Sequence, residues 1–540
     1  MRGLAMSCVF LVSSGLAAGE VLTTAEASAY TRTSTHREVM DFVHSVAATS
    51  PLVTLATLTR SPEGREVPLV ILSRERVQSP AQLAATGKPA VLIVANIHGG
   101  EVEGKEATQM LIREVGSGRL AHLLDHQVIL VIPIFNTDGN DQFGRNRGDN
   151  GPPEAGVRHN GQYLDLNRDF VKLESPEVRA LVRLLTQWDP ILVVDMHTTN
   201  GSYHRAPVTY ATGANPNGAK EIADFMWSRM FPAVGERLRR EGWDNVPYGN
   251  FADAEFPHRG WINDSIEARY GTNYVGLRNR FAILDENYSH ADFRTRVLSS
   301  FAFVRAILEF SNAHAAEMAS LVRRVDTATR DEYYRQEFAA EWKLDRLLDV
   351  TIQGFEHLKV PTTPEERARY PWLREFRMRP TETHRDYTIP YLARAIPTRT
   401  VPLPAGYVVL PGFSEALDTL RAHGLGVERL LHQVTVQGER FALEKVEVAS
   451  RLFQGHAMLT LSGRWEAAEL SLPAGAFYVD MRQPLARLIP VLLEPSSTDS
   501  LVAWGFFSRA LVRQWSLEPG VYPVLRVAQR PPVARLLVTE

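Results

Sequence analysis

Two histidines and a glutamate follow directly after apolar runs of the sequence. His98 and Glu101 come just after the run at 90–95, in a glycine-rich turn, and His197 follows the run at 191–196. Two histidines and one glutamate are a known ligand set for a catalytic zinc ion, which keeps a fourth position for water. The pattern makes His98, Glu101 and His197 candidates for a metal site, which these residues alone do not decide.

The His-x-x-Glu spacing is weak evidence by itself, because the chain contains 16 histidines and has a second copy at His314 and Glu317. That copy lies in a predicted helix, where residues three apart share one face. We interpret it as an exposed surface pair. The first copy lies in a turn whose glycines allow the backbone to bend sharply, so that both side chains can converge.

The elements that position these residues follow a repeating pattern. The three apolar runs are of strand length, rich in Val and Ile, and do not alternate with polar residues, which is typical of strands buried on both faces of a mostly parallel sheet. Strands alternating with helices predict an α/β domain, and ligands bind beyond the carboxyl ends of such strands. The runs lie at 90–95, 128–135 and 191–196, and helices are predicted at 104–113, from 175 onward, at 219–240 and at 293–321.

Composition excludes several classes of protein. Of the 540 residues, 44% are hydrophobic and 22% charged, as in globular proteins rather than disordered or polytopic membrane chains. The net charge of -3 gives no support for nucleic-acid binding. The single cysteine, Cys8, excludes a disulfide framework and a zinc site built on cysteines. No apolar run after the N-terminus is long enough for a membrane span.

The N-terminal residues 1–18 predict a secretory signal peptide. A positive charge at Arg2 precedes an apolar stretch, and small residues at Ala17 and Ala18 offer a cleavage point. Cleavage there would remove Cys8. We therefore expect a periplasmic or secreted protein.

The second half of the chain differs from the first in composition and in its hydrophobic pattern. Residues 321–400 are charged and punctuated by proline, and we expect a partly helical connector there. Residues 401–540 hold short strand-like runs and two similar strand–helix patterns, beginning at Pro404 and Pro473. They predict a smaller C-terminal α+β domain, to which the sequence assigns no role.

The segment Arg158–Phe170 resembles the substrate-binding signature of the zinc carboxypeptidase A family. The order His98, Glu101, Arg158, Asn167-Arg168, His197 and a late Glu follows the layout of that family. The resemblance covers about residues 35–315. It implies a carboxypeptidase-like catalytic domain at 30–320, with a mixed, mostly parallel central sheet flanked by helices.

The resemblance implies a role for each matching residue around the metal. His98, Glu101 and His197 would hold one Zn2+. Asp165 would accept a hydrogen bond from His98, which fixes the imidazole tautomer and makes the ring a better ligand. A helix or turn cap is the other interpretation of Asp165.

The same resemblance implies how substrate would be held. Asn167 and Arg168 would bind the substrate's C-terminal carboxylate, which suits a guanidinium that donates two parallel hydrogen bonds. Arg158 would stabilise the oxyanion that forms at the scissile carbonyl. Arg145 and Arg147 compete with Arg158 for this role.

The general base is expected after a late strand. Glu286 follows the apolar run at 281–284, and the adjacent Asp285 should point to the opposite face of that strand. The implied reaction is hydrolysis of a C-terminal amide bond by a zinc-activated water, with Glu286 as base. Tyr270 and Tyr274 are nearby, but neither is assigned as the family's substrate-contacting tyrosine.

Two other functions stay open at this point. A cell-wall peptide amidase or small-molecule deacylase can use the same scaffold, zinc ligands and carboxylate clamp. A secreted binding protein that has lost catalysis is an alternative of another class, and the presence of all three metal ligands with Glu286 argues against it. The side-chain preference and the oligomeric state are not predicted.

Overall fold

The computed structural model describes residues 21–146, 150–370, 373–513, 515–516 and 518–539. The predicted signal peptide at 1–18, Cys8 and Arg147 lie outside the described residues, so export stays a prediction. None of the helices in these ranges combines the length and the apolar character that crossing a bilayer requires.

Residues 24–335, which we call the catalytic half after their predicted role, are built on an eight-stranded sheet. The strand order is β1-β2-β4-β3-β5-β10-β6-β7. The pairs β4/β3, β3/β5, β5/β10 and β6/β7 are parallel, and the other three are antiparallel. This confirms the mixed, mostly parallel central sheet. The strands are β1 (Val53–Arg60), β2 (Glu66–Leu72), β3 (Ala90–Ala95), β4 (Val128–Ile132), β5 (Leu192–Thr199), β6 (Val208–Ala211), β7 (Asn245–Pro247) and β10 (Phe281–Tyr288).

Both faces of this sheet are covered, as the apolar runs predict. Successive residues of β3 enter two different cores: Leu92 and Val94 pack toward α6 and α9, while Val91 and Ile93 pack toward α2, α4, α8 and α10. Ser175 caps α6 by accepting from the amide of Val178. The helices are α1 (Thr24–Ala27), α2 (His36–Thr49), α3 (Pro80–Thr86), α4 (Glu103–Gly116), η1 (Ala121–Leu124), α5 (Thr137–Asp141), η2 (Leu166–Arg168), α6 (Pro176–Gln187), α7 (Lys220–Phe225), η3 (Met226–Met230), α8 (Phe231–Arg240), η4 (Pro257–Arg259), α9 (Gly271–Leu277), α10 (Phe293–Ala313), α11 (Ala315–Glu332) and η5 (Tyr333–Arg335).

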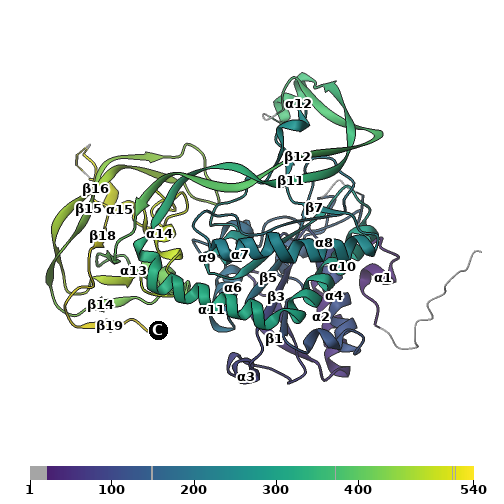
Figure 1. Cartoon of the computed structure of the whole chain (residues 1–540), viewed down its shortest axis with the longest axis horizontal. Helices are drawn as coiled ribbons and strands as arrows, with labels where there is room; N and C mark the ends of the chain where they lie inside the picture. The colour runs from purple at the N-terminus through teal and green to yellow at the C-terminus, as the bar shows by residue number, and fades with distance from the viewer. Residues whose placement is uncertain (1–20, 147–149, 371–372, 514, 517, 540) are drawn as a thin grey trace, which may run out of the picture.

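Most of the predicted connector at 321–400 is a long β-hairpin, which the sequence interpretation missed. After α11, the strands β11 (Glu337–Pro361) and β12 (Phe376–Pro402) pair antiparallel, and the short helix α12 (Pro364–Arg369) lies in the connection between them. Prolines are tolerated in such a ribbon because its edges need not donate to another strand. The hairpin extends over the catalytic half (Figure 1), where β12 pairs with β9 (Trp261–Ile262) and β9 with β8 (Asn250–Phe251).

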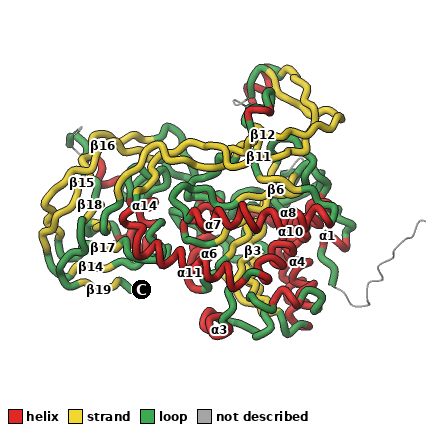
Figure 2. The backbone as a smooth tube through the Cα atoms, in the orientation of Figure 1, coloured by secondary structure: helices red, strands yellow, loops and turns green. Residues whose placement is uncertain are grey.

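Residues 406–539 form what we call the C-terminal module, a seven-stranded sheet in the order β16-β15-β18-β13-β17-β14-β19. Its described strand pairs are all antiparallel, and Figure 2 shows it beside the helices of the catalytic half. The two strand–helix patterns lie in β13–α13 and β17–α14, whose strands are direct neighbours. The elements are β13 (Gly406–Val409), α13 (Ser414–Ala422), β14 (Glu428–Leu430), β15 (Val434–Val448), β16 (Leu459–Leu472), β17 (Phe477–Asp480), α14 (Leu488–Leu493), α15 (Ser508–Leu511), β18 (Val524–Val527) and β19 (Arg535–Leu537).

The apolar core is continuous between the two halves. One buried cluster contains Leu181 of α6 and Tyr274 of α9 together with Tyr407 and Trp504 of the C-terminal module. The module is therefore packed against the helical face of the catalytic sheet. The shared core fixes its position relative to the catalytic half.

Candidate metal centre and active site

The turn after β3 is held in shape by Asn96. This residue adopts a left-handed conformation with φ of 63°, and its side-chain amide donates to the carbonyls of His98, Gly99 and Glu101 at 3.1, 3.2 and 3.0 Å. A Cβ at Gly99 would collide with the backbone of Gly139. The glycine is therefore required by close packing, and the turn places His98 and Glu101 on one side.

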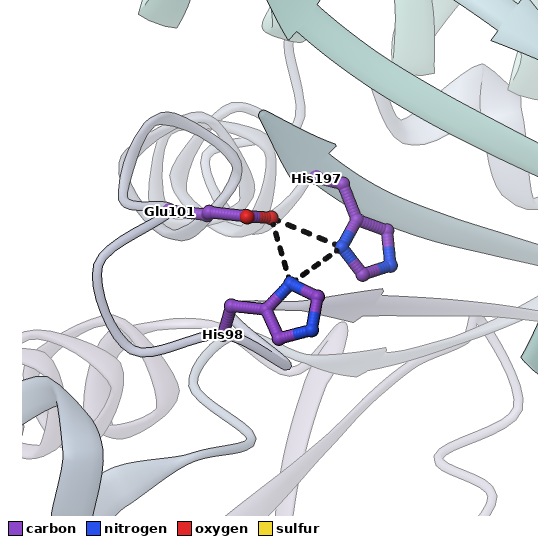
Figure 3. A group of neighbouring side chains, drawn as sticks. All are labelled: His98, Glu101 and His197. Carbon is purple, nitrogen blue, oxygen red and sulfur yellow. Dashed lines mark hydrogen bonds and ion pairs between the residues drawn. The ribbon is translucent and has the colours of Figure 1, made fainter. Parts of the chain in front are cut away.

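The side chains of His98, Glu101 and His197 converge at the carboxyl ends of β3 and β5 (Figure 3). The Nδ1 atoms of the two histidines are 3.2 Å apart, and each lies close to Oε2 of Glu101, at 3.1 Å for His98 and 3.0 Å for His197. Tetrahedral zinc with ligand bonds of 2.0–2.2 Å requires about 3.3 Å between ligand atoms. The donor set and its spacing fit zinc, and all three residues are buried.

Each histidine also has a carboxylate at its other ring nitrogen. Nε2 of His98 lies 3.0 Å from Oδ1 of Asp165, and Nε2 of His197 lies 2.9 Å from Oδ2 of Asp195. Such pairs orient metal-binding imidazoles. The sequence interpretation missed Asp195, although residues two apart on one strand share a face and Asp195 precedes His197 by two on β5. Asp165 also caps η2 by accepting from the amide of Asn167, which is the contact that its other interpretation describes.

Asp165 links the metal ligands to Arg158. Its Oδ2 accepts from Nε of Arg158 at 2.8 Å, and Nη1 of Arg158 lies 3.5 Å from Oε1 of Glu101. Burial would raise the pKa of Asp165, but the hydrogen bond with His98 and the charges of Arg158 and Arg168 hold it well below the usual range. Arg158 lines the cavity described below, whereas the competing Arg145 does not.

Asn167 and Arg168 lie on η2, at the same cavity. Oδ1 of Asn167 accepts from the amide of Gly271 at 2.8 Å, and Nδ2 lies 3.3 Å from Nε2 of His197. The guanidinium of Arg168 donates to the carbonyl of Asn167 at 2.8 Å and sits 4.3 Å above the ring of Tyr270. Tyr270 is thus the nearby tyrosine that the structure places at the cavity.

Glu286 and Asp285 point in opposite directions from β10, as strand geometry predicts. Glu286 is paired in register with His197 of β5 and lines the cavity. Burial, opposed by the charge of His197, raises the pKa of Glu286 to about 8, and among the described residues its Oε2 has no hydrogen-bond partner. Asp285 is fully buried on the other face, where it accepts from the hydroxyl of Ser300 at 3.1 Å.

A cavity of about 180 Å³ is lined by His98, Glu101, Arg158, Asn167, Arg168 and Glu286. Beyond the metal site its wall is polar and mostly uncharged, with side chains from the end of β5, from α9 and from loops: Thr198, Thr199, Asn200, Thr212, Tyr248, Asn263, Ser265, Thr272 and Asn273. Tyr248 was not found from the sequence, which has no spacing signal for it. The hydroxyl of Tyr391 on β12 donates to the Tyr248 carbonyl at 2.9 Å, so the hairpin supports this wall. Tyr274 is buried away from the cavity, with its hydroxyl 2.7 Å from His423.

The chain matches known proteins over most of this region. Residues 39–227 match the family model described as zinc carboxypeptidase. The chain is 23% identical to Carboxypeptidase 2 of Trichophyton tonsurans over 491 residues, which cover 87% of this chain and 81% of the fungal protein. It is 32% identical to Carboxypeptidase D of Mus musculus over 189 residues, which cover 29% of this chain and 13% of the mouse protein.

Solved structures with a similar region include a metallo-carboxypeptidase from Burkholderia cenocepacia, which is 17% identical, with a TM-score of 0.39 and coverage of 52% of this chain and 70% of that chain. Carboxypeptidase A from Helicoverpa armigera is 16% identical, with a TM-score of 0.40 and coverage of 53% and 75%.

The chain carries a zinc carboxypeptidase domain at residues 39–227 and is similar to named carboxypeptidases over most of its length. It is a hydrolase of the metallocarboxypeptidase class, and zinc is the metal of that family.

Proposed function

We propose that this protein removes the last residue of peptides that carry a free C-terminal carboxylate, with one zinc ion held by His98, Glu101 and His197. The observation that supports this proposal most strongly is that the side chains it requires line one cavity. His98 and Glu101 of the metal-binding set, Arg168 and Glu286 all line it, and Oε2 of Glu286 has no hydrogen-bond partner among the described residues.

Glu286 acts as the general base in this proposal. Zinc, when bound, supplies Lewis acidity and a water whose pKa is lowered to about 7. Glu286 takes the proton of the attacking water and passes it to the leaving amine. Its position beside His197 on the neighbouring strand places the carboxylate next to the metal ligands. Burial raises the pKa of Glu286 to about 8, and a dication held by His98, Glu101 and His197 would favour the ionised form of this carboxylate and so lower that pKa.

Arg158 supplies positive charge for the oxyanion that develops at the scissile carbonyl. Asp165 holds one edge of its guanidinium at 2.8 Å, and this charge-assisted hydrogen bond orients the side chain toward the cavity that it lines. Donors fixed before the reaction stabilise developing charge without reorganising, and loss of one typically costs about a hundredfold or more in rate.

Asn167 and Arg168 bind the free carboxylate of the substrate, which makes the enzyme an exopeptidase. The Tyr270 ring and the Asn167 carbonyl hold the Arg168 guanidinium at the cavity wall. A guanidinium fork matches a carboxylate with two parallel hydrogen bonds, whereas a C-terminal amide offers one acceptor and no charge.

The test is a panel of peptides that differ only in the last residue, each made with a free carboxylate and with a C-terminal amide. We expect the zinc-loaded protein to cleave the free peptides with at least about a hundredfold higher kcat/KM, because a charged pair is lost with the amide. Equal cleavage of both forms, or cleavage of acylated small molecules only, would favour the amidase or deacylase alternative. Purified protein that takes up no zinc would favour the binding protein.

A further inference from the structure

The C-terminal module reaches the active site at two points, and these contacts suggest a task for it. We propose that Gln454 and Asp499 are positioning residues, so that the module forms part of the outer layer of the active site. Gln454 acts through Asp165 on the metal ligands, and Asp499 acts through Arg269 and Tyr270 on the carboxylate clamp. The kinetic part of this inference rests on the proposed function, whereas its metal-binding part does not.

Gln454 binds the backbone of Asp165 directly. Its side-chain oxygen accepts from the amide of Asp165 at 2.8 Å. Asp165 is 8% exposed, and its carboxylate contacts both His98 and Arg158. A buried amide that loses its partner is costly, so the Asp165 backbone would shift to find another. Such a shift would move the carboxylate that orients His98.

The left-handed backbone conformation of Gln454 supports a functional role for its side chain. Gln454 has a φ of 51° and Gly455 a φ of 81°, at the tip of a tight turn in which Phe453 and His456 exchange backbone hydrogen bonds of 2.8 and 3.0 Å. Gly, Asn and Asp dominate turns with two positive φ values, because other side chains are strained there. Strained residues that the surroundings maintain tend to occur at functional sites.

The turn that carries Gln454 is anchored on both sides. Nε2 of His456 lies 2.6 Å from Oε1 of Glu174 in the catalytic half. The Phe453 ring stacks on Trp504 of the module, with 5.9 Å between ring centroids. The turn therefore holds Gln454 against Asp165 as a fixed support.

Asp499 makes the second contact, beside the clamp. It is 1% exposed and accepts from both the backbone amide and the guanidinium of Arg269, at 2.9 and 3.1 Å. The next residue, Tyr270, carries the ring that lies under the Arg168 guanidinium. Asp499 thus fixes the backbone from which Tyr270 enters the cavity.

The two contacts predict different defects. Loss of the Gln454 acceptor should weaken zinc binding and lower kcat, because it acts on His98 and Arg158. Loss of the Asp499 charge should raise KM for peptides with a free carboxylate, because it acts on the surface under Arg168. A module that only stabilised the fold would change neither quantity in this selective way.

The Gln454 contact is tested in the full-length protein with Gln454→Met, which keeps the size but removes the acceptor, and Gln454→Glu, which keeps an acceptor oxygen. We expect Gln454→Met to weaken zinc binding about tenfold, measured by competition with a chelator, and to lower kcat about tenfold. Gln454→Glu should stay within about threefold of the parent protein in both. The control is Leu452→Ala on the same loop, whose side chain is 73% exposed and which should change neither.

Two results would overturn the Gln454 assignment. One is a Gln454→Met protein whose zinc affinity and kcat both match the parent. The other is equal impairment of the Met and Glu variants, since the acceptor would then be irrelevant. The zinc measurement needs no substrate, so it stands even if the parent protein cleaves no peptide, a result that would refute the proposed function alone.

The Asp499 contact is tested with Asp499→Asn, again in the full-length protein. We expect KM for a free-carboxylate peptide to rise about tenfold, with kcat and zinc affinity little changed, because a charge-assisted hydrogen bond is weakened. The matched control is Glu494→Gln, a buried acid of the module that bonds to Tyr407 and Arg526 within the module. It should lower the melting temperature and leave KM unchanged. An unchanged KM in Asp499→Asn, or the same KM rise in Glu494→Gln, would overturn the assignment.

Discussion

The two His-x-x-Glu pairs of this chain have the same spacing but lie in very different surroundings. His98 and Glu101 are 3% and 5% exposed, at the carboxyl end of β3 and beside His197. His314 and Glu317 lie at the start of α11, with side chains 34% and 45% exposed and 3.3 Å between them, and Glu317 pairs with Arg229. Spacing alone therefore does not make a metal site.

The difference comes from what neighbouring elements contribute. At a parallel sheet edge, the adjacent strand β5 delivers His197 to the same point, and carboxylates orient both rings from behind. On a helix surface, residues three apart face solvent, and within the described ranges of the chain no neighbouring element supplies a third metal ligand to His314 and Glu317. Convergence of ligands from separate elements is what distinguishes the first pair.

The largest effect should come from breaking the first pair. Glu101→Ala should weaken zinc binding by about a thousandfold or more and abolish turnover, because a three-ligand site loses its only charged ligand. Glu317→Ala is the matched control and should bind zinc as the parent protein does. Metal content after dialysis measures both variants. Equal zinc loss in the two would contradict the contrast between the pairs.

Glu286→Gln tests whether the partly buried carboxylate beside the metal ligands is the base. We expect kcat to fall by about 10²–10⁴-fold with zinc retained, since the amide cannot accept the proton. Asp285→Asn is the control on the opposite face of β10, and it should affect stability more than turnover. Near-normal turnover in Glu286→Gln would remove Glu286 from the role of base.

Arg168→Met tests whether an arginine at the cavity binds substrate in a way that an arginine on the exposed surface does not. Loss of a guanidinium that binds a carboxylate should raise KM for free-carboxylate peptides by about 10- to 100-fold, while zinc content stays the same. Arg183→Met, at an exposed position of α6, should leave KM unchanged. If Arg168→Met binds such peptides normally, the clamp must be built from other residues.

The smallest effect is a pH dependence. Burial raises the pKa of Glu286 to about 8, and bound zinc should bring it lower. A base must be ionised, so kcat/KM should fall up to about tenfold per pH unit as the pH drops below this pKa, and level off above it. The zinc-loaded enzyme should show this acidic limb below pH 8. A profile flat from pH 4 to 9, with zinc retained throughout, would argue against a carboxylate base.

Much of the fold and site could be predicted because the signals are local. Runs such as Ala90–Ala95 read as strands buried on both faces, and the structure places their alternate residues in two cores. The resemblance to a family singled out residues that lie together at one cavity, including Glu286. The hairpin was missed because its charged, proline-containing strands have only a short buried face, at residues such as Ile352 and Tyr391.

The sequence by itself determined the resemblance to zinc carboxypeptidases, the α/β class of the catalytic half and the ligand types available for a metal, because strand periodicity and motif order are properties of the chain. Only the tertiary structure decided that Asp195 stands behind His197, that Tyr270 lies under Arg168, and that Gln454 and Asp499 reach the catalytic half from far along the chain. These contacts join residues that are distant in sequence or depend on the path of a loop, so no local pattern encodes them.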